Sequence, residues 1–138
     1  MNDVVRARAE AMWAEDRASS GLGMRLDEVT PGRARLSMTI TAAMANGHDI
    51  CHGGFIFALA DSAMAFAVNP RGDDAVAQHA AITFIRPGRV GEVLVAECVE
   101  RMHAGRSGMY DVRVCTAEGE LVAEFRGHTR SIRGKSEG

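Results

Sequence analysis

The segment HGGFIFALADSAMAFAV, residues 52–68, determines how the rest of the chain can fold. From position 55 onward nearly every residue is apolar or small, so a helix over this range has no face suited to water. The segment therefore predicts a buried helix, ending near Pro70 because proline disfavours helical geometry in the residue before it. Asp61 is the only ionisable group in this helix, and a buried carboxylate is costly unless it is paired or used.

A polar loop, residues 46–54, precedes this helix and carries Gly53 and Gly54 at the point where the helix starts. The first backbone N–H groups of a helix have no acceptor inside it, so they can bind a carbonyl oxygen or an anion. Hydrogen-bond donors facing a buried carboxylate suggest acyl chemistry.

Length and charge restrict the class of protein. At 138 residues the chain has the size of one domain, residues 1–138, with one core. Its 16 basic and 18 acidic residues nearly balance, and no basic run exceeds two residues, which argues against a nucleic-acid partner.

Cysteine usage and the N-terminus bear on the compartment. The three cysteines are odd in number and lack C-x-x-C spacing, so neither a disulfide framework nor a structural zinc site is indicated. The N-terminal residues mix acids with arginines, unlike a signal peptide, and the longest apolar run, about 14 residues, is too short to span a bilayer. We therefore expect a cytoplasmic protein without a membrane partner.

The remaining sequence predicts one helix over residues 3–17, within a peripheral segment 1–20, followed by strands only. Alternating apolar and polar residues between glycine-rich turns indicate antiparallel neighbours. The fold class is therefore α+β, with five to six antiparallel strands curved around one long helix. The tail, residues 134–138, is predicted to be disordered. The predicted strands cover residues 24–29, 34–40, 75–86, 92–102, 109–116 and 120–132.

A helix that is apolar all round poses a packing problem, since one sheet covers only one of its sides. We expect a second subunit to cover the other side.

The motif His52-Gly53-Gly54-x4-Leu59-Ala60-Asp61-x-Ala63, with Asn46 before it and Phe84-Ile85-Arg86-Pro87 after it, closely resembles the hotdog-fold acyl-CoA thioesterases. Among them it is most similar to the phenylacetyl-CoA thioesterase branch of phenylacetate degradation. The resemblance spans roughly residues 20 to 133. It implies a hotdog fold, a homodimer with a continuous sheet and commonly a homotetramer. Coenzyme A would be part of the substrate, so no separate cofactor is implied.

The resemblance also implies roles for the motif. Asp61 would act as general base or as nucleophile in thioester hydrolysis, and a structural carboxylate that caps a loop or pairs with an arginine is the alternative. The Gly53 N–H, at the positive end of the helix, would stabilise the developing oxyanion, and Gly54 would adjoin the substrate. A tight turn is the alternative reading of both glycines.

Other candidates carry less weight. By resemblance His52 orients the thioester, with a loop hydrogen bond as its alternative, and Asn46 helps to hold the attacking water or Asp61. By resemblance, the position of a serine or threonine that can assist in related enzymes matches Ala77 here, with Gln78 and Thr83 nearby. Phe57 could line an aromatic acyl pocket or be plain core. Arg86 could meet the phosphates of coenzyme A or lie on a solvated face.

A metal site is not predicted. His48 and His52 are four residues apart, but two histidines at this spacing face one way only on a helix, and the glycines around them indicate a loop. Cys51 is a weak candidate nucleophile because it and His52, being adjacent, tend to point apart.

Gly53 and Asp61 are eight residues apart on one helix, about 12 Å along its axis. One carbonyl carbon cannot lie about 3 Å from both. Two such helices packed antiparallel across a two-fold axis would bring Gly53 of one chain to Asp61 of the other.

The sequence thus predicts an acyl-CoA thioesterase with a shared site that acts on an aryl-acetyl or similar acyl-CoA. A hotdog hydroxyacyl-thioester dehydratase or hydratase, or a non-catalytic acyl-CoA-binding regulator, is the alternative.

Overall fold

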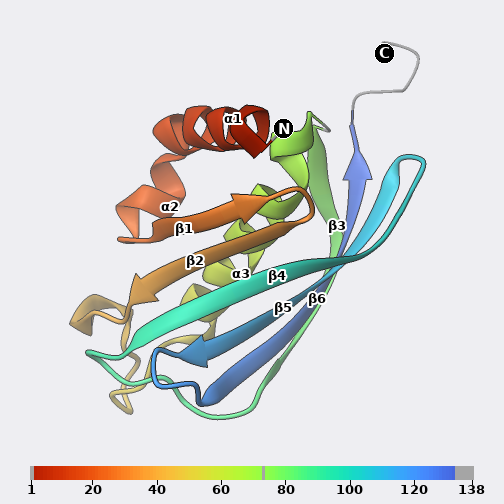
Figure 1. The fold of residues 1–138 in the computed structure, drawn as a ribbon. Helices are drawn as coiled ribbons and strands as arrows, with labels where there is room; N and C mark the ends of the chain where they lie inside the picture. Colours follow the sequence, from red (N-terminus) through yellow and green to blue (C-terminus); the bar gives the residue numbers. More distant parts are fainter. Residues whose placement is uncertain (1, 73, 133–138) are drawn as a thin grey trace.

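The computed structural model describes residues 2–72 and 74–132, which form one curved antiparallel sheet wrapped around a long helix, α3 (Figure 1). The strand order is β1-β2-β4-β5-β6-β3, so β1 and β3 are the two edges. The predicted α+β hotdog fold is confirmed, while the predicted disordered tail lies outside the described residues. The strands are β1 Arg25–Thr30, β2 Arg33–Thr39, β3 Ala75–Phe84, β4 Val93–Ala104, β5 Ser107–Thr116 and β6 Leu121–Ser131.

The central helix α3, Gly53–Val68, begins and ends where its sequence predicts. His52 is the N-cap and accepts a hydrogen bond from the Gly54 N–H through its side chain. A 3-10 turn, η2 (Asn69–Arg71), follows directly, and Pro70 lies in it. The Asn69 side chain then holds the start of β3 through two hydrogen bonds to the backbone of Ala75, of 2.6 and 3.1 Å.

One side of α3 packs against the concave face of the sheet and forms the core with it. The sheet comes so close that a methyl group at Gly127, on β6, would overlap the buried side chain of Met64. Gly127 thus leaves space for the end of the Met64 side chain, which would have to shift if position 127 carried a Cβ. The buried residues of the helix are Ile56, Leu59, Ala60, Ala63, Met64, Phe66, Ala67 and Val68.

The opposite side of α3 is not covered within one chain. Gly54 is exposed, and Ala58, Asp61 and Ala65 are partly exposed. These four positions follow the i, i+4, i+7, i+11 spacing of a single helix face. Residues 53–71 have the length and hydropathy of a membrane-crossing helix, and half of that window is buried inside the fold, as in the core helix of a soluble protein. Their apolar character is therefore explained by the core and by this uncovered face.

The N-terminal segment differs from its prediction. Instead of one helix to residue 17 there are two, α1 (Asn2–Glu15) and α2 (Arg17–Gly21). The break falls at Asp16, which caps α2 by accepting hydrogen bonds from the N–H (2.9 Å) and the hydroxyl (2.7 Å) of Ser19. The Ser19 hydroxyl also hydrogen-bonds that of Ser62 on α3 at 2.8 Å, so α2 is anchored beside Asp61.

Candidate active site

The start of α3 leaves one backbone donor available. The Gly54 N–H donates to Nδ1 of His52 at 2.9 Å, and the Phe55 N–H donates to the His52 carbonyl at 3.0 Å. Among residues 2–72 and 74–132, no acceptor is found for the Gly53 N–H. This donor lies at the positive end of the helix dipole, so it is suited to bind a carbonyl oxygen that gains negative charge.

A cavity of about 380 Å³ opens beside this donor. The aromatic residue in its lining is Phe84, which is half exposed and packs over Gly53: a Cβ at Gly53 would lie 2.8 Å from Cζ of Phe84. Gly53 therefore makes room for Phe84, a contact that the sequence did not suggest. The cavity is lined by Asn46, Ile50, Cys51, Gly53, Ile56, Phe84, Ile85, Arg86, Pro87 and Gly88.

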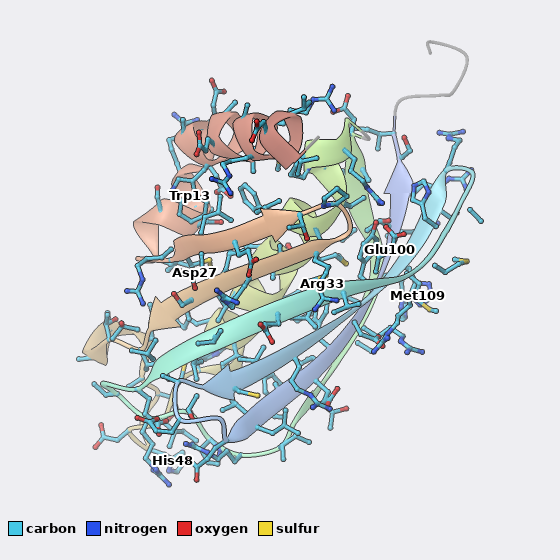
Figure 2. All side chains as sticks on the ribbon, viewed as in Figure 1. Trp13, Asp27, Arg33, His48, Glu100 and Met109 are labelled. Atoms are coloured by element: carbon cyan, nitrogen blue, oxygen red, sulfur yellow. The ribbon has the colours of Figure 1, made fainter. Side chains whose placement is uncertain are left out.

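Asn46 holds the loop in front of the helix together. Its side-chain oxygen accepts hydrogen bonds from the N–H groups of His48 (2.9 Å) and Ile50 (3.4 Å), and its own N–H donates to the Ile50 carbonyl at 2.8 Å. Figure 2 places the labelled His48 of this loop at the end of the molecule away from Glu100 and Met109. Within the described part of the chain, no three His, Cys, Asp or Glu side chains are grouped to hold a metal ion.

The hydrogen bond of His52 limits what its ring can do. Because Nδ1 accepts the Gly54 N–H, the neutral ring carries its proton on Nε2. The exposed ring also meets Phe55 edge to face, with 6.1 Å between centroids. His52 thus makes a loop hydrogen bond, as the alternative interpretation of this residue predicts. Its Nε2–H is still free to donate to a thioester. Its orienting role stays a prediction.

Asp61 lies on the uncovered side of α3, partly buried. Burial raises the pKa of its carboxyl group above the ordinary aspartate value. In the part of the chain that the structure describes, it has neither a hydrogen-bond nor an ion-pair partner. The alternative that Asp61 caps a loop or pairs with an arginine therefore finds no support within one chain.

Gly53 and Asp61 are not brought together in a single chain. Both lie on α3, eight positions apart, which is about 12 Å along the axis. Asp61 is also not among the residues that line the cavity at Gly53. The donor and the carboxylate therefore cannot serve one carbonyl group within one protomer.

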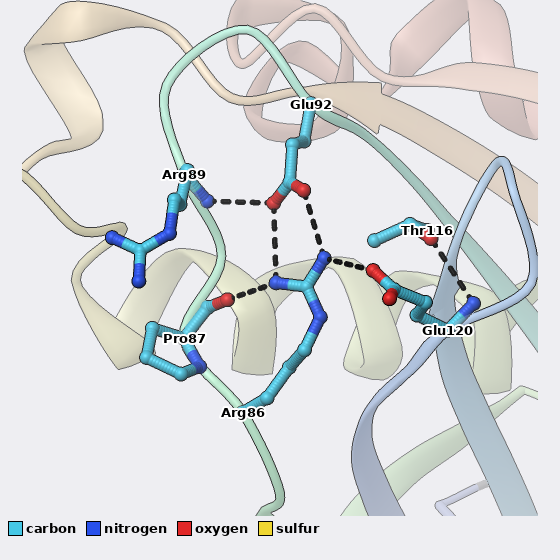
Figure 3. Close-up of polar contacts among 6 residues, drawn as sticks. All are labelled: Arg86, Pro87, Arg89, Glu92, Thr116 and Glu120. Atoms are coloured by element: carbon cyan, nitrogen blue, oxygen red, sulfur yellow. Dashed lines mark hydrogen bonds and ion pairs between the residues drawn. The ribbon is translucent and has the colours of Figure 1, made fainter.

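The other two predicted substrate contacts have protein partners. Phe57 packs edge to face against Phe125, with 5.3 Å between centroids. Arg86 lies at the cavity, but its guanidinium forms ion pairs of 2.8 Å with Glu92 and with Glu120 (Figure 3). Both carboxylates raise the pKa of Arg86. The sequence did not predict either pairing. Glu92 is six positions from Arg86 across a loop, and Glu120 is 34 positions away, a separation at which no local pattern indicates contact.

Comparisons with known proteins agree with this geometry. The sequence profile of the thioesterase superfamily matches residues 48–123, which contain the helix and both of its chemical groups. The chain is 40% identical over 126 residues to the acyl-coenzyme A thioesterase PaaI of Escherichia coli, covering 91% of this chain and 90% of that protein. The solved structure of E. coli PaaI, from the phenylacetic acid degradation operon, superposes with a TM-score of 0.94 at 38% identity over 96% of both chains. A mutant of the phenylacetic acid degradation protein PaaI from Thermus thermophilus gives 0.81 at 37% identity, over 85% of this chain and 100% of that one.

The chain therefore belongs to the thioesterase superfamily. Within that superfamily it is an acyl-CoA thioesterase of the PaaI type, and hence a thioester hydrolase.

Replacing Asp61 tests the carboxylate. Asp61→Asn is expected to lower kcat by about 10²–10⁴, the usual effect of losing an acid–base group.

Burial raises the pKa of Asp61 in the folded state, so this group's contribution to stability is lost as pH rises through that pKa. The neutral variant should therefore not melt below wild type at pH 7. For the same reason the wild-type kcat should rise with pH through a pKa above the ordinary aspartate value of about 3.9. Thiol release and calorimetry measure both; retention of more than about half the activity would exclude a catalytic role.

Two substitutions at Gly53 separate its N–H from its lack of a side chain. Proline removes the N–H, and the backbone of His52 (φ −60°, ψ 132°) suits a residue that precedes proline at the first helical position. Gly53→Ala keeps the N–H and brings a Cβ equally close to Phe84. If the N–H binds the oxyanion, Gly53→Pro should lose about 10²–10³ in kcat and Gly53→Ala much less. Equal losses in the two variants would point to crowding by the side chain instead.

Proposed function

We propose that this protein hydrolyses phenylacetyl-CoA, or a similar aryl-acetyl-CoA, to the free acid and coenzyme A in the cytoplasm. The observation that carries the proposal is the Gly53 N–H, which has no acceptor among the described residues. It opens onto a largely apolar cavity, and the half-exposed ring of Phe84 lies beside it. An aromatic wall next to the carbonyl site favours an aryl group close to the thioester. The E. coli and T. thermophilus PaaI proteins, both named for phenylacetic acid degradation, support the same substrate class.

In this mechanism the Gly53 N–H donates to the thioester oxygen and stabilises the negative charge that develops there. Asp61 either removes a proton from a water that attacks the carbonyl carbon or attacks that carbon itself, in which case water releases the acid from the anhydride. In both routes the C–S bond breaks and the sulfur leaves as the thiolate of coenzyme A, which takes up a proton. The oxygen of water ends in the product acid when water attacks the substrate's acyl carbon, and in Asp61 when water attacks the Asp61 side of the anhydride. Asn46 and the Nε2–H of His52 are the proposed second contacts to the water and the thioester.

The active site is proposed to form between two subunits. The uncovered face of α3 is built of small residues around Asp61, so two such helices can approach closely in antiparallel orientation. The edge strand β3 has exposed apolar side chains and a free edge that can pair with the same strand of a second chain. Together these features favour a homodimer with two shared sites, and a pair of dimers would form the proposed homotetramer.

A thiol-release screen tests the substrate class. We expect wild-type protein to release coenzyme A from phenylacetyl-CoA with a higher kcat/KM than from acetyl-CoA or palmitoyl-CoA, because only an aryl-acetyl group places a ring against Phe84. A preference for either aliphatic ester would refute the aryl assignment. A change in enoyl absorbance without thiol release would indicate the dehydratase alternative, and binding without either reaction would indicate a regulator.

Complementation tests the shared site. In a dimer with Gly53→Pro in one subunit and Asp61→Ala in its partner, one site collects both defects and the other has none. Dissociating and reassociating the two inactive variants at random makes half of the dimers mixed, so about a quarter of wild-type activity should return. Mass spectrometry confirms the mixed dimers. If they form and no thiol release returns, each site lies within one chain.

A further inference from the structure

The connection between β3 and β4 is closed by an ion pair between its two ends. Arg86 donates to Glu92 through Nη2–Oε2 at 2.8 Å and Nη1–Oε1 at 3.4 Å, and it also donates to the Pro87 carbonyl (Figure 3). The same Glu92 accepts the Arg89 N–H at 2.8 Å. The carboxylate of Glu92 is thus hydrogen-bonded to both the beginning and the middle of the connection, residues 86–92.

A second carboxylate fixes this arrangement to the sheet. Glu120, in the turn between β5 and β6, accepts from Nη2 of Arg86 at 2.8 Å. Its own N–H donates to the hydroxyl of buried Thr116 at 3.1 Å, so the turn that carries Glu120 is itself anchored. The side chains of Arg86 and Glu92 are only 25% and 28% exposed, which shields their pairing from solvent more than a surface pair. We call Arg86, Glu92 and Glu120 the Arg86 cluster.

The connection held by the Arg86 cluster bears directly on the loop before α3. The Gly88 carbonyl accepts the Cys51 N–H at 2.8 Å, and Ile50 forms a β-bridge with Arg89. Contact is close, since a Cβ at Gly88 would lie 2.7 Å from Cδ1 of Ile40. Cys51 is two residues before Gly53, so the position of the connection sets the position of the Gly53 N–H. It also supplies four of the cavity's lining residues, 85–88.

We propose that Arg86 is a positioning residue for thioester hydrolysis, which holds the Gly53 N–H and the cavity wall in place through Glu92, Glu120 and the Gly88–Cys51 hydrogen bond, and that it does not bind the phosphates of coenzyme A. Two carboxylates already compensate its single charge, so a phosphate would have to compete with both for the same N–H groups. The proposal rests on the proposed function for its catalytic effect. Its structural part, the coupling of the cluster to Cys51, stands independently.

Two substrates and two variants distinguish positioning from phosphate binding. We compare phenylacetyl-CoA with the phenylacetyl thioester of N-acetylcysteamine, which lacks the phosphates and the adenine. As a positioning residue, Arg86→Gln should lower kcat by about 10-fold or more on both substrates, since a shift of about 1 Å in a reacting group can cost about 10²-fold. Glu92→Gln should lower kcat in the same way on both, although a carboxylate cannot bind phosphate. A phosphate ligand would instead show a raised KM for phenylacetyl-CoA in Arg86→Gln alone, with normal hydrolysis of the short thioester.

Hydrogen exchange of the Cys51 amide gives a readout that does not depend on activity. It should exchange faster in Arg86→Gln and Glu92→Gln and at the wild-type rate in Glu124→Gln. Glu124 makes a comparable but exposed ion pair with Arg113 on the sheet surface, so its variant is the matched control and should also keep full activity. If Arg86→Gln does not fold, the nearly isosteric Glu92→Gln carries the test alone.

Unchanged Cys51 exchange in the cluster variants, or an activity loss confined to the coenzyme A ester, would overturn the proposal. Absence of wild-type thiol release from both thioesters would refute the proposed function instead, and the exchange measurement would still decide whether the Arg86 cluster holds the loop.

Discussion

The packing of one side of α3 against the concave face of the sheet is the constraint on which the rest of this structure depends. Large side chains such as Leu59 and Met64 are buried against the strands, and Gly127 on β6 leaves space for the end of the Met64 side chain. Once that side is fixed, the rotation of the helix about its axis is fixed too. Asp61 is then turned away from the sheet, and the helix start is presented at the end of the sheet beside the connection between β3 and β4.

At the start of α3, one residue accepts hydrogen bonds from two of the first three backbone N–H groups. His52 uses its side chain and its carbonyl to accept from the two N–H groups after Gly53, while the Gly53 N–H has no acceptor among the described residues and can donate to a ligand. A donor with no protein partner is costly to bury, and here it opens onto a cavity instead. The loop in front is held by Asn46, which satisfies its own neighbours, and by Gly88 from the far connection. The proposed chemistry thus depends on a loop whose hydrogen bonds leave the Gly53 N–H open to the cavity.

Among the described residues, the carboxylates whose pKa values are shifted fall into two electrostatic classes. Glu92 and Asp111 are bound by arginines, which lower their pKa values, that of Asp111 to about 2. Asp61 has no such partner in the described chain and its pKa is raised by burial alone. The paired acids stabilise the fold as ions, and as pH falls through their lowered pKa values that stabilisation is lost. Asp61 does not contribute in this way, and an unpaired, partly buried acid is typical of a functional group.

The sequence by itself determined the α+β class, the bounds of α3 and the chemical motif, because apolar periodicity, Pro70 and the spacing of glycines to Asp61 are local properties of the chain. It did not predict the break at Asp16, where a side-chain cap overrides a continuous helical pattern. Nor could it show that Phe84 packs on Gly53 or that Arg86 forms ion pairs with Glu92 and Glu120. Those contacts arise only when the sheet curves around the helix and brings a turn 34 residues away in the chain to the cavity. Tertiary structure alone decided them, because pairing between distant side chains depends on strand order and register, which local pattern does not encode.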